Sequence, residues 1–205
     1  SQEQDLNCAQ EIAALGCVCL TFDLRGHAAT KARRQEVTLA QNYADVLATF
    51  DLLAAQPAVD RSAIAVIGSS YGGYLGALLT AERSVRWLAL RVPALYRDSG
   101  WSKAKAALDR ADLQRLRRMV LTPENNKALQ ACATFAGDAL IVESEQDDYV
   151  PHSTVANYVS AMRQARSITY RVIAGADHAL SDPACQRAYD ALLVRWTTEM
   201  VLGAR

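Results

Sequence analysis

The stretch AVIGSSYGGYLGALL, residues 65–79, passes from a β-branched apolar run into an alanine- and leucine-rich run through a short segment of glycine, serine and tyrosine. The first run predicts a buried strand and the last predicts a helix, so the segment between them is a strand-to-helix turn. Gly68, Ser70 and Gly72 have the G-x-S-x-G spacing, which lifts the middle hydroxyl clear of a sheet. Ser69 has no such glycines, so Ser70 is the predicted nucleophile.

The same turn favours chemistry at Ser70 in a second way. We expect glycine at 68 and 72 because strand and helix backbones nearly touch there. Ser70 would precede a helix N-terminus, where the Tyr71 backbone amide can donate to an oxyanion. A glycine-rich turn whose serines have no function would show the same sequence pattern. The turn therefore indicates catalysis only if a base and an acid accompany it.

A base and an acid follow later strands in the order expected for this architecture. A serine hydroxyl needs a histidine to take its proton and a carboxylate to orient that histidine. His178 lies in AGADHAL, just after the last predicted strand, and Asp147 and Asp148 lie in EQDDYVP, after the strand before it. The order serine, acid, histidine predicts a catalytic triad at the carboxyl edge of the sheet, with either aspartate as the acid.

The rest of the chain alternates strand and helix patterns without repeats. With 51% hydrophobic and 21% charged residues, its 205 residues suit one globular domain, 1–205. Apolar runs predict five strands and intervening patterns predict four helices, which together indicate a doubly wound, mostly parallel α/β sheet. The strands are expected at 17–23, 63–68, 86–92, 138–144 and 168–174, and the helices at 38–55, 71–82, 151–165 and 183–200.

Residues 93–134 interrupt this alternation with polar helical sequence and no strand. We interpret the segment as a small helical cap over the carboxyl edge, where open parallel sheets bind ligands. Its aromatic residues Tyr96 and Trp101 are candidate substrate-binding residues, although packing explains a cap aromatic equally well. The arginines at 115, 117 and 118 are expected to form a solvated helix face rather than an anion site.

Composition excludes several other classes of protein. Twenty-two basic residues balance 22 acidic ones, which argues against a nucleic-acid partner. The five cysteines are scattered and lack C-x-x-C spacing, so neither a disulfide framework nor a metal site is expected. No apolar run reaches the roughly 18 residues of a membrane span. We expect a soluble, cytoplasmic protein with no cofactor, and find no indication of oligomeric state.

Four segments resemble the α/β-hydrolase superfamily, namely DLRGH (23–27), GSSYGGY (68–74), DDYVP (147–151) and GADHAL (175–180). Within it, the chain is similar to dienelactone-hydrolase-like esterases and to the catalytic domains of prolyl-oligopeptidase-type serine peptidases. The resemblance implies an α/β-hydrolase fold with Ser70 as nucleophile and His178 as base. In these families two residues and then Val-Pro follow the acid, which implies Asp147 rather than Asp148.

The chain also departs from the family pattern. DLRGH is similar to the family's DxRGHGxS, but Ala28 and Thr30 replace its last glycine and serine, and Arg25 and His27 are expected to be structural or rim residues. Family members carry an HG-containing loop and a further strand before position 17, and residues 6–15 resemble the helix that follows that loop. We therefore expect the missing strand and the second oxyanion donor to lie upstream of Ser1, outside this sequence.

These observations predict a serine hydrolase that cleaves a small-molecule ester through an acyl-serine intermediate. Esters are favoured because this stretch shows no large accessory domain of the kind that prolyl-oligopeptidase-type peptidases carry. A serine peptidase of the aminopeptidase or oligopeptidase type is the alternative. A binding protein that keeps the fold without chemistry is another, because fold alone does not establish activity.

Overall fold

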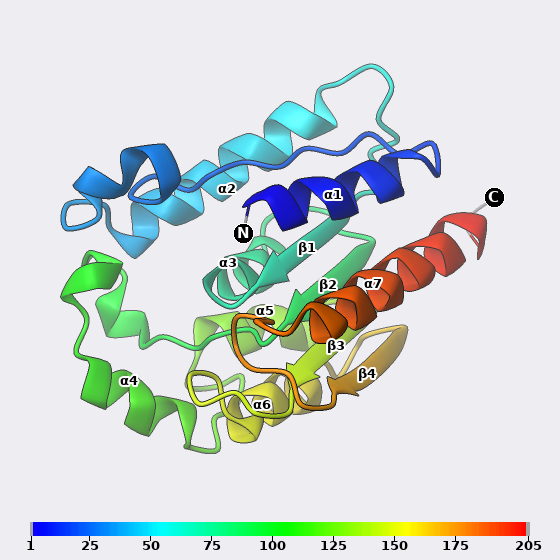
Figure 1. Ribbon diagram of the computed structural model, residues 1–205. Coiled ribbons are helices and arrows are strands. Elements are labelled where there is room, and N and C mark those ends of the chain that lie inside the picture. The colour runs from blue at the N-terminus through cyan, green and yellow to red at the C-terminus, as the bar shows by residue number, and fades with distance from the viewer. Residues whose placement is uncertain (1, 204–205) are drawn as a thin grey trace.

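The computed structural model describes residues 2–203 and the side chains of residues 6–203. Its centre is a four-stranded parallel sheet in the order β1-β2-β3-β4 (Figure 1). The strands are β1 (Ala65–Ser69), β2 (Trp87–Arg91), β3 (Asp138–Ser144) and β4 (Ser167–Ile173). All four were expected from their apolar runs. Because they are parallel, their carboxyl ends meet at one edge of the sheet.

Helices cover both faces of the sheet, as the doubly wound prediction requires (Figure 1). One face packs against α2 (Leu39–Ala54), α3 (Tyr71–Leu79), α5 (Lys127–Thr134) and α6 (His152–Ala161), and the other against α1 (Gln2–Ala13) and α7 (Pro183–Gly203). Successive residues of a strand serve opposite faces. On β2, Leu88 and Leu90 join the first core while Trp87 and Ala89 join the second. This double burial explains why the strands read as continuous apolar runs.

The strand expected at 17–23 is wrong. This segment forms no regular secondary structure, and Val18, Leu20 and Phe22 are 46%, 41% and 42% exposed. Within residues 2–203, β1 pairs with β2 alone, so no neighbouring strand offers this segment a ladder of hydrogen bonds. An apolar, β-branched pattern describes a surface that suits a sheet, but the strand exists only where a partner backbone lies beside it.

The segment 93–134 divides into two parts. Its first part holds two short 3₁₀ turns, η2 (Asp98–Gly100) and η3 (Lys105–Ala107), followed by α4 (Arg110–Arg117), which lies apart from the sheet in Figure 1. Its last part is α5, which packs in the same layer as α3 and α6 and contributes Leu129 and Cys132 to the core. The predicted cap therefore corresponds at most to the residues before α5.

The arginines of α4 also differ from expectation. Arg115 and Arg118 are exposed, as predicted for a solvated face, but Arg117 is buried. Its guanidinium lies over the ring of Tyr96 and donates a hydrogen bond to the Tyr149 carbonyl. The prediction was wrong for Arg117 because α4 packs against the loop that follows β3, which no local pattern reveals.

No helix within the described part of the chain is both long enough and apolar enough to cross a membrane.

Candidate active site

Ser70 stands between β1 and α3 in a conformation that non-glycine residues rarely adopt. Its φ is 51° and its ψ is −112°, and it is the N-cap residue of α3. Backbone hydrogen bonds hold it from both sides. The Ser70 amide donates to the Arg91 carbonyl at 2.9 Å, and the Ser70 carbonyl accepts from the amides of Tyr74 and Ala94 at 3.1 and 3.0 Å. The surrounding backbone thus maintains a strained turn that presents the hydroxyl at the carboxyl edge.

The two glycines of the G-x-S-x-G spacing are not equivalent in the structure. A Cβ atom on Gly68 would lie 2.6 Å from the Gly72 carbonyl oxygen and 2.8 Å from the Gly73 nitrogen. A Cβ atom on Gly72 would meet nothing within 4 Å. The second close approach is instead at Gly73, where a Cβ would lie 3.1 Å from Pro93. The expected close backbone approach is therefore correct, because the Gly72 carbonyl lies against Gly68, but it excludes a side chain only at Gly68; the expectation that residue 72 must also lack a side chain is wrong.

This asymmetry predicts different outcomes for two alanine substitutions. We expect Gly68→Ala to lower the free energy of unfolding by about 1–3 kcal/mol or more, because backbone atoms must move to admit the methyl group. Gly72→Ala has space around it and lies inside α3, so we expect it to be neutral or to stabilise by up to about 1 kcal/mol. Urea unfolding of both variants measures the difference. Equal stability of the two would show that the turn tolerates a side chain at both positions.

Three side chains from separate loops form a continuous hydrogen-bonded chain at this edge. His178 Nε2 lies 3.0 Å from Ser70 Oγ, and His178 Nδ1 lies 2.6 Å from Asp147 Oδ2. With the ring proton on Nδ1, the imidazole donates to Asp147 and its Nε2 can accept the hydroxyl proton of Ser70. The structure thus brings together the three residues that the sequence predicted as a catalytic triad.

The loop after β3 distinguishes the two candidate acids. The side chain of Asp147 is 1% exposed, and its Oδ1 accepts hydrogen bonds at 2.8 Å from the amides of Tyr149 and Val150. Its other oxygen is therefore held toward His178. Asp148 is exposed to solvent. The geometry makes Asp147 the carboxylate that orients the imidazole, in agreement with the resemblance.

Arg91, at the end of β2, connects the serine and the histidine and was not anticipated from the sequence. Its carbonyl accepts from the Ser70 amide, and its Nη1 donates to the His178 carbonyl at 3.1 Å and to Ser144 Oγ at 3.4 Å. The side chain also lies over the ring of Tyr189. The sequence could have indicated Arg91, because an arginine that ends an otherwise apolar strand needs polar partners at the sheet edge. Arg91 is a positioning residue for the His178 loop.

The backbone amide and the ring of Tyr71, the first residue of α3, have different environments. First-turn amides have no acceptor within their own helix, so the Tyr71 amide is suited to the oxyanion role predicted for it. The ring is buried, and its hydroxyl donates to Asn42 Oδ1 at 3.0 Å, while Asn42 Nδ2 donates to the Arg25 carbonyl at 2.9 Å. Burial raises the pKa of the Tyr71 hydroxyl, so this group stays neutral.

The DLRGH segment contributes to this network. Arg25 pairs with Asp45 at 2.6 Å, and the His27 ring stacks on Tyr71 with 6.1 Å between ring centroids. These contacts support the turn that carries Ser70. They match the structural role expected for Arg25 and His27.

The two aromatic residues proposed to bind substrate have packing partners. Tyr96 is 2% exposed and its ring meets those of Tyr71 and Tyr74 edge to face. Trp101 is half-buried, with its ring 5.4 Å from that of Tyr43. Packing accounts for both residues, and their role in substrate binding stays a prediction.

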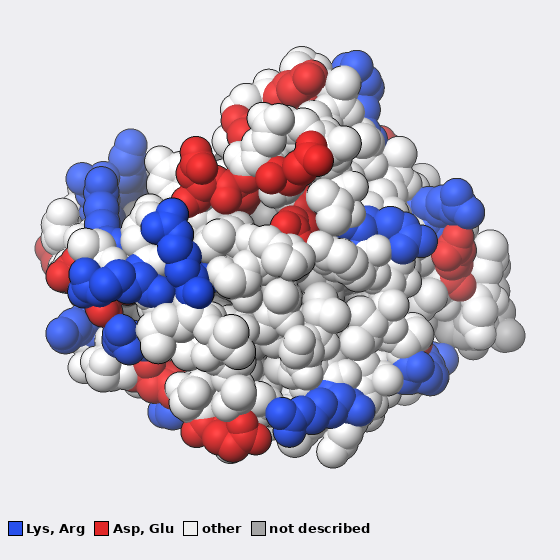
Figure 2. Space-filling view, turned by 90° about the horizontal axis from the view of Figure 1, so that it is seen from below, with Lys and Arg blue, Asp and Glu red and all other residues white. Residues whose placement is uncertain are grey.

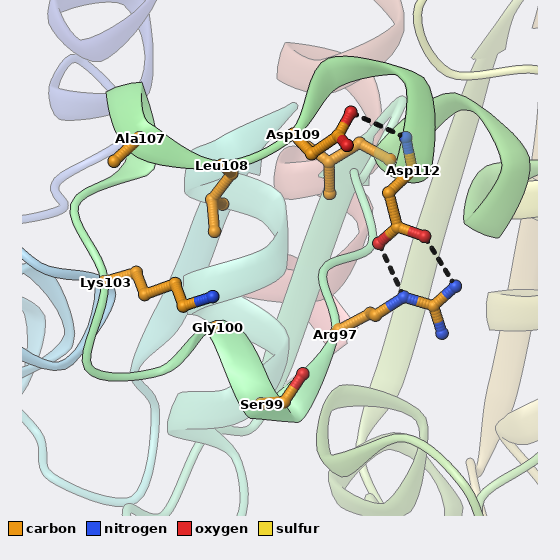
Figure 3. Close-up of a pocket in the computed structure, with 9 residues that line it drawn as sticks. Arg97, Ser99, Gly100, Lys103, Ala107, Leu108, Asp109 and Asp112 are labelled. Carbon is orange, nitrogen blue, oxygen red and sulfur yellow. Dashed lines mark hydrogen bonds and ion pairs between the residues drawn. The ribbon is translucent and has the colours of Figure 1, made fainter.

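A cavity of about 170 Å³ lies within the segment that precedes α5 and does not include the predicted triad (Figure 3). The bidentate ion pair between Arg97 and Asp112 closes one side of it, and Lys103 extends toward it from the other. None of the residues that line it is Ser70, Asp147 or His178. This cavity is therefore not the space in which the triad would act.

The profile of the prolyl oligopeptidase family matches residues 5–203. No curated protein matches the sequence.

Solved structures with the same architecture include two esterases. An esterase domain from Rhodothermus marinus has a TM-score of 0.66 at 15% identity, over 97% of this chain and 80% of that one. Est1E from Butyrivibrio proteoclasticus, solved with ferulic acid, has a TM-score of 0.66 at 18% identity, over 98% and 82%. These similarities confirm the predicted α/β-hydrolase fold.

A peptidase shares the fold too. The acylaminoacyl peptidase of Pyrococcus horikoshii has a TM-score of 0.58 at 16% identity, and the match covers 84% of this chain. The chain spans only 30% of that peptidase's length.

Proposed function

The chain belongs to the prolyl oligopeptidase family and is a hydrolase of the serine α/β-hydrolase type, and on this premise we propose that it cleaves carboxylic esters through an acyl-serine intermediate. The observation that carries the proposal is the arrangement of Ser70, His178 and Asp147, with 3.0 Å from hydroxyl to imidazole and 2.6 Å from imidazole to carboxylate. Both distances suit proton transfer and orientation without any rearrangement.

In the proposed reaction, Ser70 Oγ attacks the ester carbonyl carbon while its proton passes to His178 Nε2. The carbonyl oxygen becomes an oxyanion that the Tyr71 amide stabilises at the positive end of α3. When the tetrahedral intermediate collapses, the bond to the alcohol breaks and His178 returns its proton to the leaving oxygen. Water then attacks the acyl-serine, His178 accepts the water's proton, and the acid leaves as Ser70 regains a proton. Asp147 keeps the imidazole oriented and stabilises its charged form throughout.

Peptide hydrolysis is the second candidate, and the family match favours it. An amide is the more demanding substrate, because its amine departs only after full protonation, whereas an alkoxide or phenoxide leaves more readily. The two esterases support the ester proposal, since this chain spans at least four fifths of each. A triad that cleaves amides also cleaves activated esters, so the useful measurement is the ratio of the two activities for one acyl group.

Matched substrates measure that ratio. The N-acetyl-leucine p-nitrophenyl ester and p-nitroanilide share an acyl group and a chromophore, and p-nitrophenyl esters of increasing chain length measure the size of the acyl pocket. We expect the ester to exceed the anilide in kcat/KM by well over tenfold, a ratio that corresponds to more than about 1.4 kcal/mol in activation free energy. Since a peptidase would also cleave the activated ester faster than the anilide, the anilide itself is decisive. Anilide hydrolysis above the background rate of the Ser70→Ala variant would indicate a peptidase instead.

A further inference from the structure

Lys105, in the 3₁₀ turn η3, is a half-buried cation that has no partner anion among residues 6–203. Its Nζ lies 4.3 Å from the centroid of the Tyr71 ring. No hydrogen bond or ion pair of its ammonium group occurs within residues 6–203. Burial lowers the pKa of Lys105, and the nearby Arg117 charge lowers it further, so the two cations lie close enough to repel each other.

Arg117, at the end of α4, is the second such cation. Its guanidinium carbon lies 5.3 Å from the centroid of the Tyr96 ring, and its Nη1 donates to the Tyr149 carbonyl at 3.1 Å. Its Nε is buried and has no hydrogen-bond partner in the part of the chain whose side chains are described. The Arg117 carbonyl accepts from Ser153 and Thr154, which anchors the residue firmly.

Two more exposed arginines near this edge, Arg25 and Arg97, have carboxylate partners. Arg25 pairs with Asp45 at 2.6 Å, and Arg97 pairs with Asp112 at 2.6 Å although both groups are more exposed than Arg117. A cation withdrawn from water without a counter-charge is costly, so a protein retains one where something else supplies the charge. At Lys105 the described residues supply an aromatic ring, and at Arg117 they supply the Tyr96 side chain and the Tyr149 carbonyl, but no carboxylate.

Intermediate residues link both cations to the proposed catalytic site. The ring under Lys105 belongs to Tyr71, the residue next to Ser70, and it meets the Tyr96 ring under Arg117 edge to face at 5.4 Å. The residue whose carbonyl accepts from Arg117 is Tyr149, and its ring lies 5.3 Å from the His178 ring. Lys105 is thus linked through Tyr71 to the turn that carries Ser70, and Arg117 is linked through Tyr149 to the His178 ring.

The surface charges are mixed on the face that Figure 2 shows. Lys and Arg are densest toward the side where Figure 1 places α4, while Asp and Glu lie among them and in a band across the upper part of the same face. Basic side chains near α4 raise the local concentration of anions there.

We propose that Lys105 and Arg117 form a subsite for the carboxylate of a substrate whose scissile ester reaches Ser70. Lys105 contacts the carboxylate directly, and Arg117 contributes its charge from behind the Tyr96 ring. The substrate class is then a half-ester of a dicarboxylic acid, or an ester that carries a free carboxylate elsewhere. The cleavage of such an ester rests on the proposed function, whereas carboxylate binding does not.

A matched pair of esters tests the subsite by catalysis. Mono-p-nitrophenyl glutarate carries a free carboxylate, and its methyl ester has the same chain without the charge. We expect Lys105→Met, which keeps the apolar stem over Tyr71, to lower the ratio of charged to neutral kcat/KM by tenfold or more. Lys103→Met removes an exposed ammonium two residues away, so it is the matched control and should change the ratio less than twofold. An unchanged ratio in Lys105→Met would overturn the proposal.

Calorimetry with glutarate separates this proposal from the proposed function, because it needs no turnover. We expect glutarate to bind the Ser70→Ala variant and to lose tenfold or more of its affinity when Lys105→Met is added. That result would support the subsite even if no ester were cleaved. Glutarate that binds equally with and without Lys105, or that does not bind at all, would contradict it. Urea unfolding of Lys105→Met shows whether a loss reflects the charge rather than the fold.

Discussion

Replacing Ser70 by alanine is expected to abolish ester hydrolysis, with a fall in kcat/KM on the order of 10⁴-fold or more. The substitution removes the only atom that forms the acyl bond and leaves His178 without a proton to accept. It should also eliminate covalent labelling by a fluorophosphonate, which reacts only with an activated serine. Hydrolysis of p-nitrophenyl esters and mass spectrometry of the labelled protein measure the two effects.

Ser69 provides the matched control, because it is the neighbouring serine on the same turn. Its Oγ is buried and has no hydrogen-bond partner among the described side chains, so Ser69→Ala leaves no polar group unsatisfied. We expect that variant to keep its labelling and most of its activity. Labelling that persists in Ser70→Ala would place the nucleophile elsewhere. A wild-type protein that is neither labelled nor active would favour the alternative of a binding protein on this fold.

Replacing Asp147 by asparagine is expected to lower kcat/KM by about 10⁴-fold. The asparagine oxygen can still accept the amides of Tyr149 and Val150, so the loop should keep its conformation. Its NH₂ group would then face His178 Nδ1, and the ring must put its proton on Nε2 to accept that donor. An Nε2 that carries a proton cannot take another from Ser70. Steady-state kinetics with a p-nitrophenyl ester measures the loss.

The control for Asp147 is Asp148→Asn, because it changes the same functional group on the adjacent, exposed residue. We expect that variant to stay within a few-fold of wild type. Urea unfolding of both variants separates catalytic loss from instability. If Asp148→Asn caused the larger loss of rate at equal stability, Asp147 would not be the residue that orients the histidine.

Much of the fold could be predicted from the sequence because the strands β1–β4 are buried on both faces. Such strands read as continuous apolar runs, and the G-x-S-x-G turn joins one of them to a helix. The same reasoning failed at 17–23, where an apolar run lacks a neighbouring strand among the described residues. The hydrophobic pattern of a segment indicates which surfaces it can pack against. Whether it pairs as a β-strand depends on another strand lying beside it.

Charged side chains were harder to place than apolar ones. Arg117 lies in a polar helix and looks solvated, yet α4 packs it against Tyr96 and the Tyr149 carbonyl. Arg91 ends a buried strand, and only the fold shows that it holds the His178 carbonyl. The position of a charge depends on elements distant in the sequence, so local periodicity says little about it.

By itself the sequence determined the order of the chemical groups: a serine on a strand-to-helix turn, a pair of aspartates after a later strand, and a histidine after the next. Strand succession alone brings these groups to one edge, because parallel strands end on the same side. Only the tertiary structure decided that Asp147 faces the imidazole and that Gly68 and not Gly72 is sterically required. It also decided that Lys105 and Arg117 meet no carboxylate among the side chains that the structure describes. These features depend on distances of a few ångströms between atoms far apart in the chain, and such distances exist only once the helices and strands have packed.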